Sequence, residues 1–359
     1  MNMQQCPQQK RKKVFSTLVL ASVVVLSFTI WLAMSTHGWA QAIPPESIAL
    51  STYDQGAPTI AIPFFREGTL FLSHVKKPME GATTTTEVSR RIIADNVYRL
   101  ADVNRQTGEY LYQTIEGTNR ESVANVTTWL GDASGKVTRV YTGGGYVKLS
   151  PGGSYITATD ENGMLRIIDL KGEERAVLGK ATYAIFSPDG TRLAFLNAIP
   201  YSIGDAGGIS IIAIASGKTL MTYKPDGAEY IPLAFSEDGN VLYFAAINTA
   251  ALQNSDPSNQ NRVDLYSLLV SEGAVPQLVT TGIQKLPYMD YTRVEYLSGS
   301  RLLALSAEDT TWVVNTQTGS VQTFPKVIDV LRVGTGNTLL ARSSDESVSS
   351  KIWSVLTAR

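Results

Sequence analysis

Hydrophobic and polar positions in this chain of 359 residues alternate in short blocks and not at helical spacing. The clearest block is a pair of apolar runs, Tyr183 to Phe186 and Leu193 to Leu196, separated by polar turn residues. Short apolar runs bounded by Gly, Pro, Asp and Ser predict strands that are buried on both faces. No window after residue 45 shows a convincing amphipathic helical period. The pattern therefore predicts an all-β fold.

The turn inside this block has the residues that a tight hairpin needs. Pro188 fixes φ near the value required at the second position of a type I turn. Gly190 supplies the positive φ with which three-residue hairpin loops usually close. We expect the Ser187 hydroxyl to bond the backbone amide two residues further on. The stretch is thus predicted to be strand, turn and strand.

Versions of this hairpin recur along the chain, at Leu149–Gly153, Phe186–Gly190 and Phe235–Gly239. The turn serines Ser150 and Ser187 are 37 residues apart, and Ser187 and Ser236 are 49 apart. Each hairpin is followed by an apolar strand, a turn ending in Gly and a further strand. Four strands per unit at this period predict a β-propeller.

The hairpin Phe186-Ser187-Pro188-Asp189-Gly190, followed by Leu193-Ala194-Phe195, resembles the WD-repeat-like propellers of bacterial envelope proteins, the TolB type among them. The resemblance covers residues 145–340 well and the remainder weakly. It implies a blade and no chemistry. The chain lacks the Trp-Asp and Gly-His pairs of eukaryotic WD repeats, so a peptide-binding role does not transfer residue by residue.

The number of blades depends on how residues 60–143 are divided. Four units are readable, and they span 145–179, 180–227, 228–285 and 286–325. A last unit, 326–359, ends after its third strand, so we expect a strand near the N-terminus, Ile48 to Tyr53, to complete it. A repeat of about 40 residues favours two blades in residues 60–143 and seven in total, with six as the alternative. Residues 59–359 are therefore assigned to the propeller, and 43–58 to a linker with the ring-closing strand.

The first 42 residues have the features of an export segment. A positive cluster, Lys10 to Lys13, precedes the apolar run Val14 to Ala33, and Ala40-Gln41-Ala42 fits a signal-peptidase site. The apolar run is also long enough to span a bilayer as a helix. Residues 1–42 are therefore a cleaved signal peptide or a retained signal anchor. Both place the propeller outside the cytoplasm, periplasmic, extracellular or tethered, with membrane contact only through residues 14–33 if uncleaved.

Charge and residue usage exclude several classes of function. The only cysteine, Cys6, lies before the apolar run, so the exported part has no disulfide. Without the four basic residues of the N-terminal cluster, 27 of the 31 basic residues remain against 32 acidic ones, with no basic stripe for nucleic acid. The exported part has one histidine, His74, and no Gly-x-Ser-x-Gly motif. We therefore predict no catalytic residue, no metal site and no cofactor.

Three connections are longer than the repeat requires: Lys76–Asn96, Asn197–Gly208 and Asn248–Asn261. Each is expected to follow the second strand of its unit, on the side where consecutive units are joined. Insertions gathered on one face of a repeat protein often mark the binding face. We therefore expect the ligand on this face and not on the face of the Ser-Pro-Asp-Gly turns.

Aromatic and acidic residues of this predicted face form the candidate binding site. They are Tyr201, Asp205, Glu229, Tyr230, Tyr288, Asp290 and Tyr291. Such a surface suits a protein, peptide or glycan partner. The alternative is that these tyrosines cap strand ends and that the long loops are solvated variation.

Three functions follow from this sequence. The first is a non-enzymatic binding or scaffold module. The second is a propeller enzyme whose carboxylates, such as Asp160, Asp205 and Asp290, converge at the centre. The third is a sensor ectodomain, if the N-terminal segment is retained. Several converging carboxylates would distinguish the second from the first.

Overall fold

The computed structural model describes most of the chain from Thr59 onward. The described ranges are 59–79, 81–104, 107–116, 125–197, 207–224, 228–248, 262–284, 293–297, 301–307, 310–333, 338–343, 345 and 352–357. All regular structure in these ranges is β-strand apart from single helical-turn residues, which confirms the predicted fold class. The N-terminal export segment and the expected closing strand Ile48 to Tyr53 lie outside the described residues.

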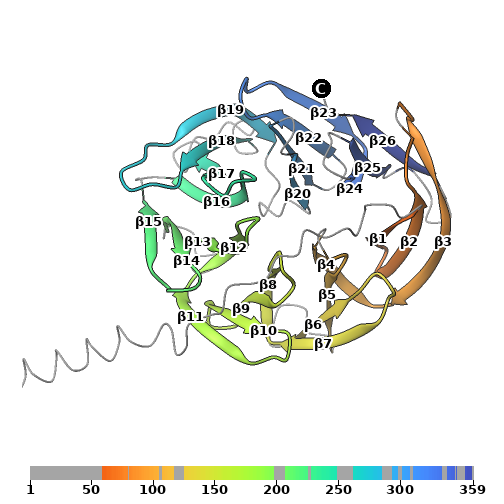
Figure 1. Ribbon diagram of the computed structural model, residues 1–359, viewed down its shortest axis with the longest axis horizontal. Helices are drawn as coiled ribbons and strands as arrows, with labels where there is room; N and C mark the ends of the chain where they lie inside the picture. The colour runs from red at the N-terminus through yellow and green to blue at the C-terminus, as the bar shows by residue number, and fades with distance from the viewer. Residues whose placement is uncertain are drawn as a thin grey trace, which may run out of the picture.

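Five of the sheets are antiparallel and contain four strands each, which follow in chain order from the centre of the ring outward (Figure 1). The first contains β4 (Val97–Val103), β5 (Tyr110–Ile115), β6 (Val126–Gly131) and β7 (Val137–Thr142). The second contains β8 (Gly144–Leu149), β9 (Tyr155–Asp160), β10 (Met164–Asp169) and β11 (Glu174–Lys180). The third contains β12 (Thr182–Phe186), β13 (Arg192–Leu196), β14 (Ile209–Ala213) and β15 (Thr219–Tyr223).

Two more four-stranded sheets follow around the ring (Figure 1). One contains β16 (Ala228–Phe235), β17 (Val241–Asn248), β18 (Arg262–Leu269) and β19 (Gln277–Gln284). The other contains β20 (Arg293–Leu297), β21 (Leu302–Ala307), β22 (Thr310–Asn315) and β23 (Val321–Pro325). The four units read from the sequence between residues 145 and 325 therefore correspond to four separate sheets.

The ring is closed by a sheet of six strands that joins the two ends of the described chain. Its order is β1 (Thr59–Arg66), β2 (Thr69–Lys76), β3 (Thr84–Ala94), β26 (Ile352–Thr357), β25 (Thr338–Ser343) and β24 (Val327–Val333). The start of β3 pairs with β26, and the rest of β3 pairs with β2. Both edge strands lie on the inner side of the ring (Figure 1), where β1 packs against β4 and β24 against β20.

The described strands form six hydrogen-bonded sheets, so the prediction of seven blades is not supported. The physical reason is the length of β3, whose 11 residues serve both ends of the chain at once. The first and last stretches consequently share one sheet where we expected two. Closure by an early segment of the chain was anticipated, but the described strand that pairs with the outer side of β26 is β3.

The hydrophobic core lies between neighbouring sheets. Leu111 of one sheet, for example, packs with Val147, Ile156 and Ala158 of the next, and all four are almost fully buried. Burial on both faces explains why the strands were read as continuous apolar runs and not as alternating ones. Trp312 is also buried in such a cluster.

The recurring hairpin forms as predicted, with one difference in its hydrogen bonds. Gly190 has φ 66° and its N–H donates to the Ser187 carbonyl at 2.8 Å. The Ser187 hydroxyl donates to the Asp189 carboxylate at 2.5 Å and accepts the N–H of Arg192 at 2.9 Å. The backbone N–H of Thr191, two residues after Asp189, donates to the Asp189 carboxylate. Our expectation that the serine binds the amide two residues on was therefore wrong, because its oxygen accepts the N–H of Arg192 across the hairpin and its proton goes to the Asp189 carboxylate.

The two ends of the strands differ in what they carry. We call the end at which one sheet passes to the next the connection end, and the end with the Ser-Asp-Gly hairpins the turn end. The inner strands β4, β8 and β12 begin at the connection end. β1 runs in the opposite direction, because the N–H of Val97, at the start of β4, donates to the carbonyl of Gly68 in the β1–β2 turn at 2.8 Å.

This reversal corrects the prediction that all three long connections share one face. Most of the predicted loop Lys76–Asn96 is strand β3, and the short β2–β3 connection lies at the turn end. The β13–β14 and β17–β18 connections do leave from the connection end, although most of their residues lie outside the described ranges. The reversed direction of β1 could not be foreseen from the sequence, because the inner strand of each readable repeat begins at the connection end.

Candidate binding site

Five of the seven predicted site residues lie outside the described residues. These are Tyr201, Asp205, Tyr288, Asp290 and Tyr291. The other two, Glu229 and Tyr230, are in β16, and the backbone of Glu229 pairs with that of Ile247.

Tyr230 does not face a ligand. It is 6% exposed and its ring packs edge to face, at 5.7 Å, against both Tyr223 and Phe244. A tyrosine followed directly by Ile231 and other apolar residues has the environment of a core strand. The structure therefore places Tyr230 in the core between two sheets.

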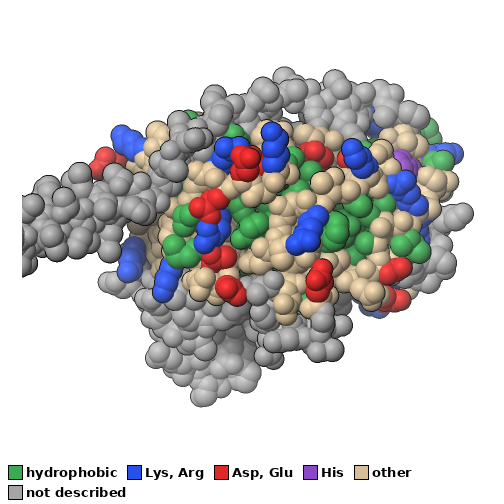
Figure 2. Space-filling model, turned by 90° about the horizontal axis from the view of Figure 1, so that it is seen from below, with side chains coloured by type: hydrophobic (Ala, Val, Ile, Leu, Met, Phe, Trp, Pro, Cys, Tyr) green, Lys and Arg blue, Asp and Glu red, His purple; other side chains and the backbone are tan. Residues whose placement is uncertain are grey.

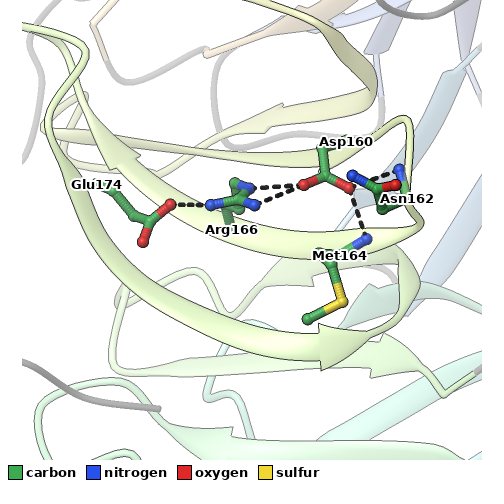
Figure 3. Close-up of polar contacts among 5 residues, drawn as sticks. All are labelled: Asp160, Asn162, Met164, Arg166 and Glu174. Atoms are coloured by element: carbon green, nitrogen blue, oxygen red, sulfur yellow. Dashed lines mark hydrogen bonds and ion pairs between the residues drawn. The ribbon is translucent and has the colours of Figure 1, made fainter. Parts of the chain in front are cut away.

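Asp160, the carboxylate named for a catalytic centre, is occupied by local contacts (Figure 3). One oxygen accepts the backbone N–H groups of Asn162 and Met164, each at 2.9 Å. The other accepts two N–H groups of Arg166, at 2.8 and 2.6 Å, and Arg166 also pairs with Glu174. Asp160 closes the β9–β10 turn, and its carboxylate oxygens are engaged there.

The electrostatics of Asp160 agree with this structural role. Desolvation by burial raises its pKa, but the N–H groups of Met164 and Asn162 together with Arg166 outweigh that effect. The net result is a pKa below the ordinary value of 3.8. A carboxyl held in the ionised form by its neighbours is a poor proton donor at neutral pH.

Figure 2 shows one side of the molecule, on which the Lys and Arg side chains of the described residues are interspersed with Asp and Glu. Within the described ranges, no group of three or more His, Cys, Asp or Glu residues could hold a metal ion. His74 of β2 lies next to Ser89, with Nδ1 and Oγ 3.3 Å apart.

A different group of residues lies together at the connection end of β4, β8 and β12. These three inner strands are neighbours around the ring (Figure 1). The first residues of each bring together Tyr98, Arg99, Tyr146 and Tyr183, which we call the Arg99 cluster. The Arg99 Cζ atom lies 5.7 Å from the centre of the Tyr98 ring and 5.2 Å from that of Tyr146. Both distances are within the range of cation–π attraction.

A buried glutamine holds the arginine in place. Gln113 of β5 is completely buried and accepts the Nε–H of Arg99 at 2.7 Å. Its amide nitrogen donates to Thr128 Oγ1 at 3.0 Å and to the carbonyls of Gly144 and Gly145 at 3.1 and 3.0 Å. All of its polar atoms therefore have partners, and the guanidinium is fixed to two adjacent sheets.

Glycine at position 144 allows this close approach. A Cβ there would lie 2.8 Å from Tyr141 Cε1 and 3.2 Å from Ala158 Cβ, closer than side chains normally pack. Because glycine has no side chain, the carbonyls of Gly144 and Gly145 can lie next to Gln113 and Arg99. The lack of space around position 144 thus explains the glycine in the middle of the Gly143-Gly144-Gly145 run.

The two half-buried tyrosines of the cluster, Tyr146 and Tyr183, join β8 to β12. Their hydroxyl oxygens are 3.1 Å apart and their ring centres 4.5 Å apart. Tyr183 has φ 51°, in the left-handed region that bulky residues rarely adopt, and the β12–β13 pairing shifts register there. Such conformations persist where surrounding contacts hold them, and they concentrate at functional sites.

The cluster has the composition of a recognition site. Tyr98 is exposed, and arginine and tyrosine are the residues that most often dominate binding energies. Sequence reasoning missed these residues because it followed loop length and not strand starts. The usable signals were the Tyr98-Arg99 pair at a strand start and the triple glycine directly before Tyr146.

Comparisons of the sequence with known proteins found no match. No family model matches the chain, and no curated protein matches it either. Among the described residues, no helix is long and apolar enough to cross a bilayer.

Comparison of the structure with solved structures did find similar chains. A nidogen/laminin complex has a TM-score of 0.48 at 12% identity and covers 74% of this chain and 93% of that chain. Chaetomium thermophilum Sqt1 bound to the N-terminus of the ribosomal protein L10 has a TM-score of 0.46 at 14% identity, with coverage of 81% and 79%. The Cps50 (Swd1) β-propeller domain of Myceliophteria thermophila has a TM-score of 0.49 at 14% identity, and the match covers 88% of this chain and 100% of that chain. The ring of antiparallel sheets described above makes this chain an all-β propeller.

Proposed function

We propose that this protein is a non-enzymatic binding module that recognises a protein, peptide or glycan partner at its connection end. The Arg99 cluster is the observation that carries the proposal. It combines an exposed tyrosine, two half-buried tyrosines and a fixed cation from three sheets. Aromatic and guanidinium groups held rigidly by their neighbours lose little entropy when they bind a partner.

The proposal includes export or tethering by residues 1–42, with the propeller outside the cytoplasm. The basic cluster, apolar run and small-residue site in the sequence support it, as does the resemblance to envelope propellers of the TolB type.

The enzyme alternative has no specific support among the described residues. Asp160 is engaged in its turn and ion pair, whereas the other two carboxylates named for a central site lie outside the described residues. The sensor alternative depends on retention of the N-terminal segment. Sequencing the N-terminus of the mature protein decides between cleavage and anchoring.

Partner capture tests the proposed face. Two variants are compared, Tyr98→Ala alone and a triple alanine variant of the predicted loop tyrosines Tyr201, Tyr288 and Tyr291. An exposed turn-end residue, Glu237→Ala, is the matched control. We expect both tyrosine variants to lose proteins or glycans that the parent chain captures from an envelope extract, and the control to keep them. Full capture by both tyrosine variants would refute the proposed face.

A further inference from the structure

Three partly buried arginines of the protein pair with carboxylates, whereas Arg99 and Arg192 donate to neutral acceptors among the described residues. Arg90, Arg166 and Arg175, with side chains 15%, 28% and 31% exposed, each form an ion pair with a carboxylate. Arg99 is also partly buried but forms none within the described residues. A partly desolvated charge without a counter-ion is unfavourable, and a bound anion would reduce this cost.

The hydrogen bonds of Arg99 leave one part of the guanidinium available. Nε donates to Gln113 and Nη2 donates to the carbonyl of Gly145 at 2.5 Å. Nη1 has no acceptor among the described residues. The acceptors that Arg99 has among the described residues are neutral, so none of them compensates its positive charge. An anion that approaches Nη1 would meet a cation whose position is already fixed on its other edge.

We propose that Arg99 is a carboxylate-binding site, with Tyr98 and Tyr146 forming its walls. This inference rests on the proposed function and specifies the chemistry of the partner. A planar guanidinium with free N–H groups matches the geometry of a carboxylate. The two tyrosine rings, whose centres lie 5.7 and 5.2 Å from the Arg99 Cζ atom, exclude some water from it and lower the local dielectric, which strengthens a charge-assisted hydrogen bond. The carboxylate comes from the C-terminus of a partner chain or from an Asp or Glu side chain.

Three pools of random hexapeptides distinguish these sources. The first has free C-termini and no Asp or Glu, the second has amidated C-termini and includes Asp and Glu, and the third is amidated and lacks both. Each pool is passed over the immobilised propeller, and retained peptides are sequenced. Retention of the first pool identifies a C-terminal carboxylate, and retention of the second a side-chain carboxylate.

Arginine variants connect retention to this site. Arg99→Gln should weaken binding of the best retained peptide at least about thirtyfold, because it removes one member of a charge pair. Arg99→Lys keeps the charge but not the fork, and should weaken it about tenfold. The control is Arg139→Gln, since Arg139 is an exposed arginine of β7 that donates to the Thr142 hydroxyl and, among the described residues, to no carboxylate. It should change nothing.

Several outcomes would overturn the inference. Equal retention of the third pool would show that no carboxylate is needed, and retention of no pool would refute the site. Unchanged binding by a folded Arg99→Lys or Arg99→Gln variant, checked by its melting temperature, would do the same. If partner capture still depends on Tyr98 while all pools behave alike, the proposed function stands and only the carboxylate site fails.

Discussion

The two ends of strand β12 differ in how their polar groups are used. At the turn end, Ser187 bonds both the Asp189 carboxylate and the Arg192 amide within one hairpin. At the connection end, Tyr183 reaches across to Tyr146 of the preceding sheet. The same division applies further along the ring, where Arg99 and Gln113 tie two sheets together at the connection end.

This difference separates stability from recognition. Groups that bond each other inside a hairpin close the chain locally and leave no donor for a ligand. Groups that bridge two sheets at the connection end are positioned by both sheets, and one of them, Arg99, has no carboxylate partner among the described residues. Variants at the turn end should therefore affect folding alone, and variants of the Arg99 cluster should affect binding. The predictions below test this separation, from the largest expected effect to the smallest.

The largest loss of stability is expected for Gln113→Leu. The change removes a fully buried amide and leaves the Gly144 carbonyl, the Thr128 hydroxyl and the Arg99 Nε without the bonds that Gln113 made to them. Unsatisfied buried groups of this kind cost about 1–3 kcal/mol each, so we expect unfolding free energy to fall by about 3 kcal/mol. Urea denaturation measures it. Gln317→Leu, on an exposed turn, should stay within about 0.5 kcal/mol of the parent.

Removal of the hairpin hydroxyl should give a smaller loss and no change in binding. In Ser187→Ala, the Arg192 amide loses its side-chain acceptor and Asp189 loses a donor. We expect destabilisation by about 1–2 kcal/mol. Thermal unfolding checks the stability, and partner capture checks the binding. A stable Ser187→Ala variant that no longer captures a partner would contradict the separation of the two ends. Ser271→Ala, at another exposed turn, is the control.

Acid should weaken the turn end through its aspartates. Desolvation raises the pKa of Asp189, but hydrogen bonds from Ser187 and Thr191 outweigh it and the net pKa is lowered. The Ser236 hydroxyl and the backbone N–H of Asn240 lower the pKa of Asp238. A carboxyl whose folded pKa is depressed stabilises the fold above its unfolded value of 3.8 and loses this as pH falls through the folded pKa. Unfolding free energy should therefore decline below about pH 4, and Asp189→Asn should flatten the decline.

The smallest effect is expected for Asp160→Asn, a variant at the connection end outside the Arg99 cluster. The amide still accepts the turn N–H groups but loses the charge opposite Arg166. A partly exposed ion pair contributes about 0–1 kcal/mol, so stability should change by no more than that. Partner capture should be unchanged. Loss of capture in this variant would extend the binding site across the β9–β10 turn.

The sequence predicted what depends on local chemistry. Repeated Ser-x-Asp-Gly turns and short apolar runs were enough for an all-β propeller, because turn residues and buried strands act over a few residues. The reversed β1 and the double pairing of β3 depend on where the two ends of the chain meet, which no local pattern records. Tyr230 was assigned to the surface because its strand was read as a loop. Arg99 was missed because its position depends on hydrogen bonds to Gln113 and Gly145, which are distant from it in the sequence.

Photo-cross-linking from the two ends of the ring tests the central claim most directly. A benzophenone amino acid is placed at Tyr98, in the exposed part of the Arg99 cluster, or at Glu237, on an exposed hairpin of the turn end. Both variants are irradiated in the presence of the same carboxylate-bearing peptide or captured partner. The account predicts a cross-linked product from position 98 and none from position 237. Equal yields from both, or a product from position 237 alone, would contradict it.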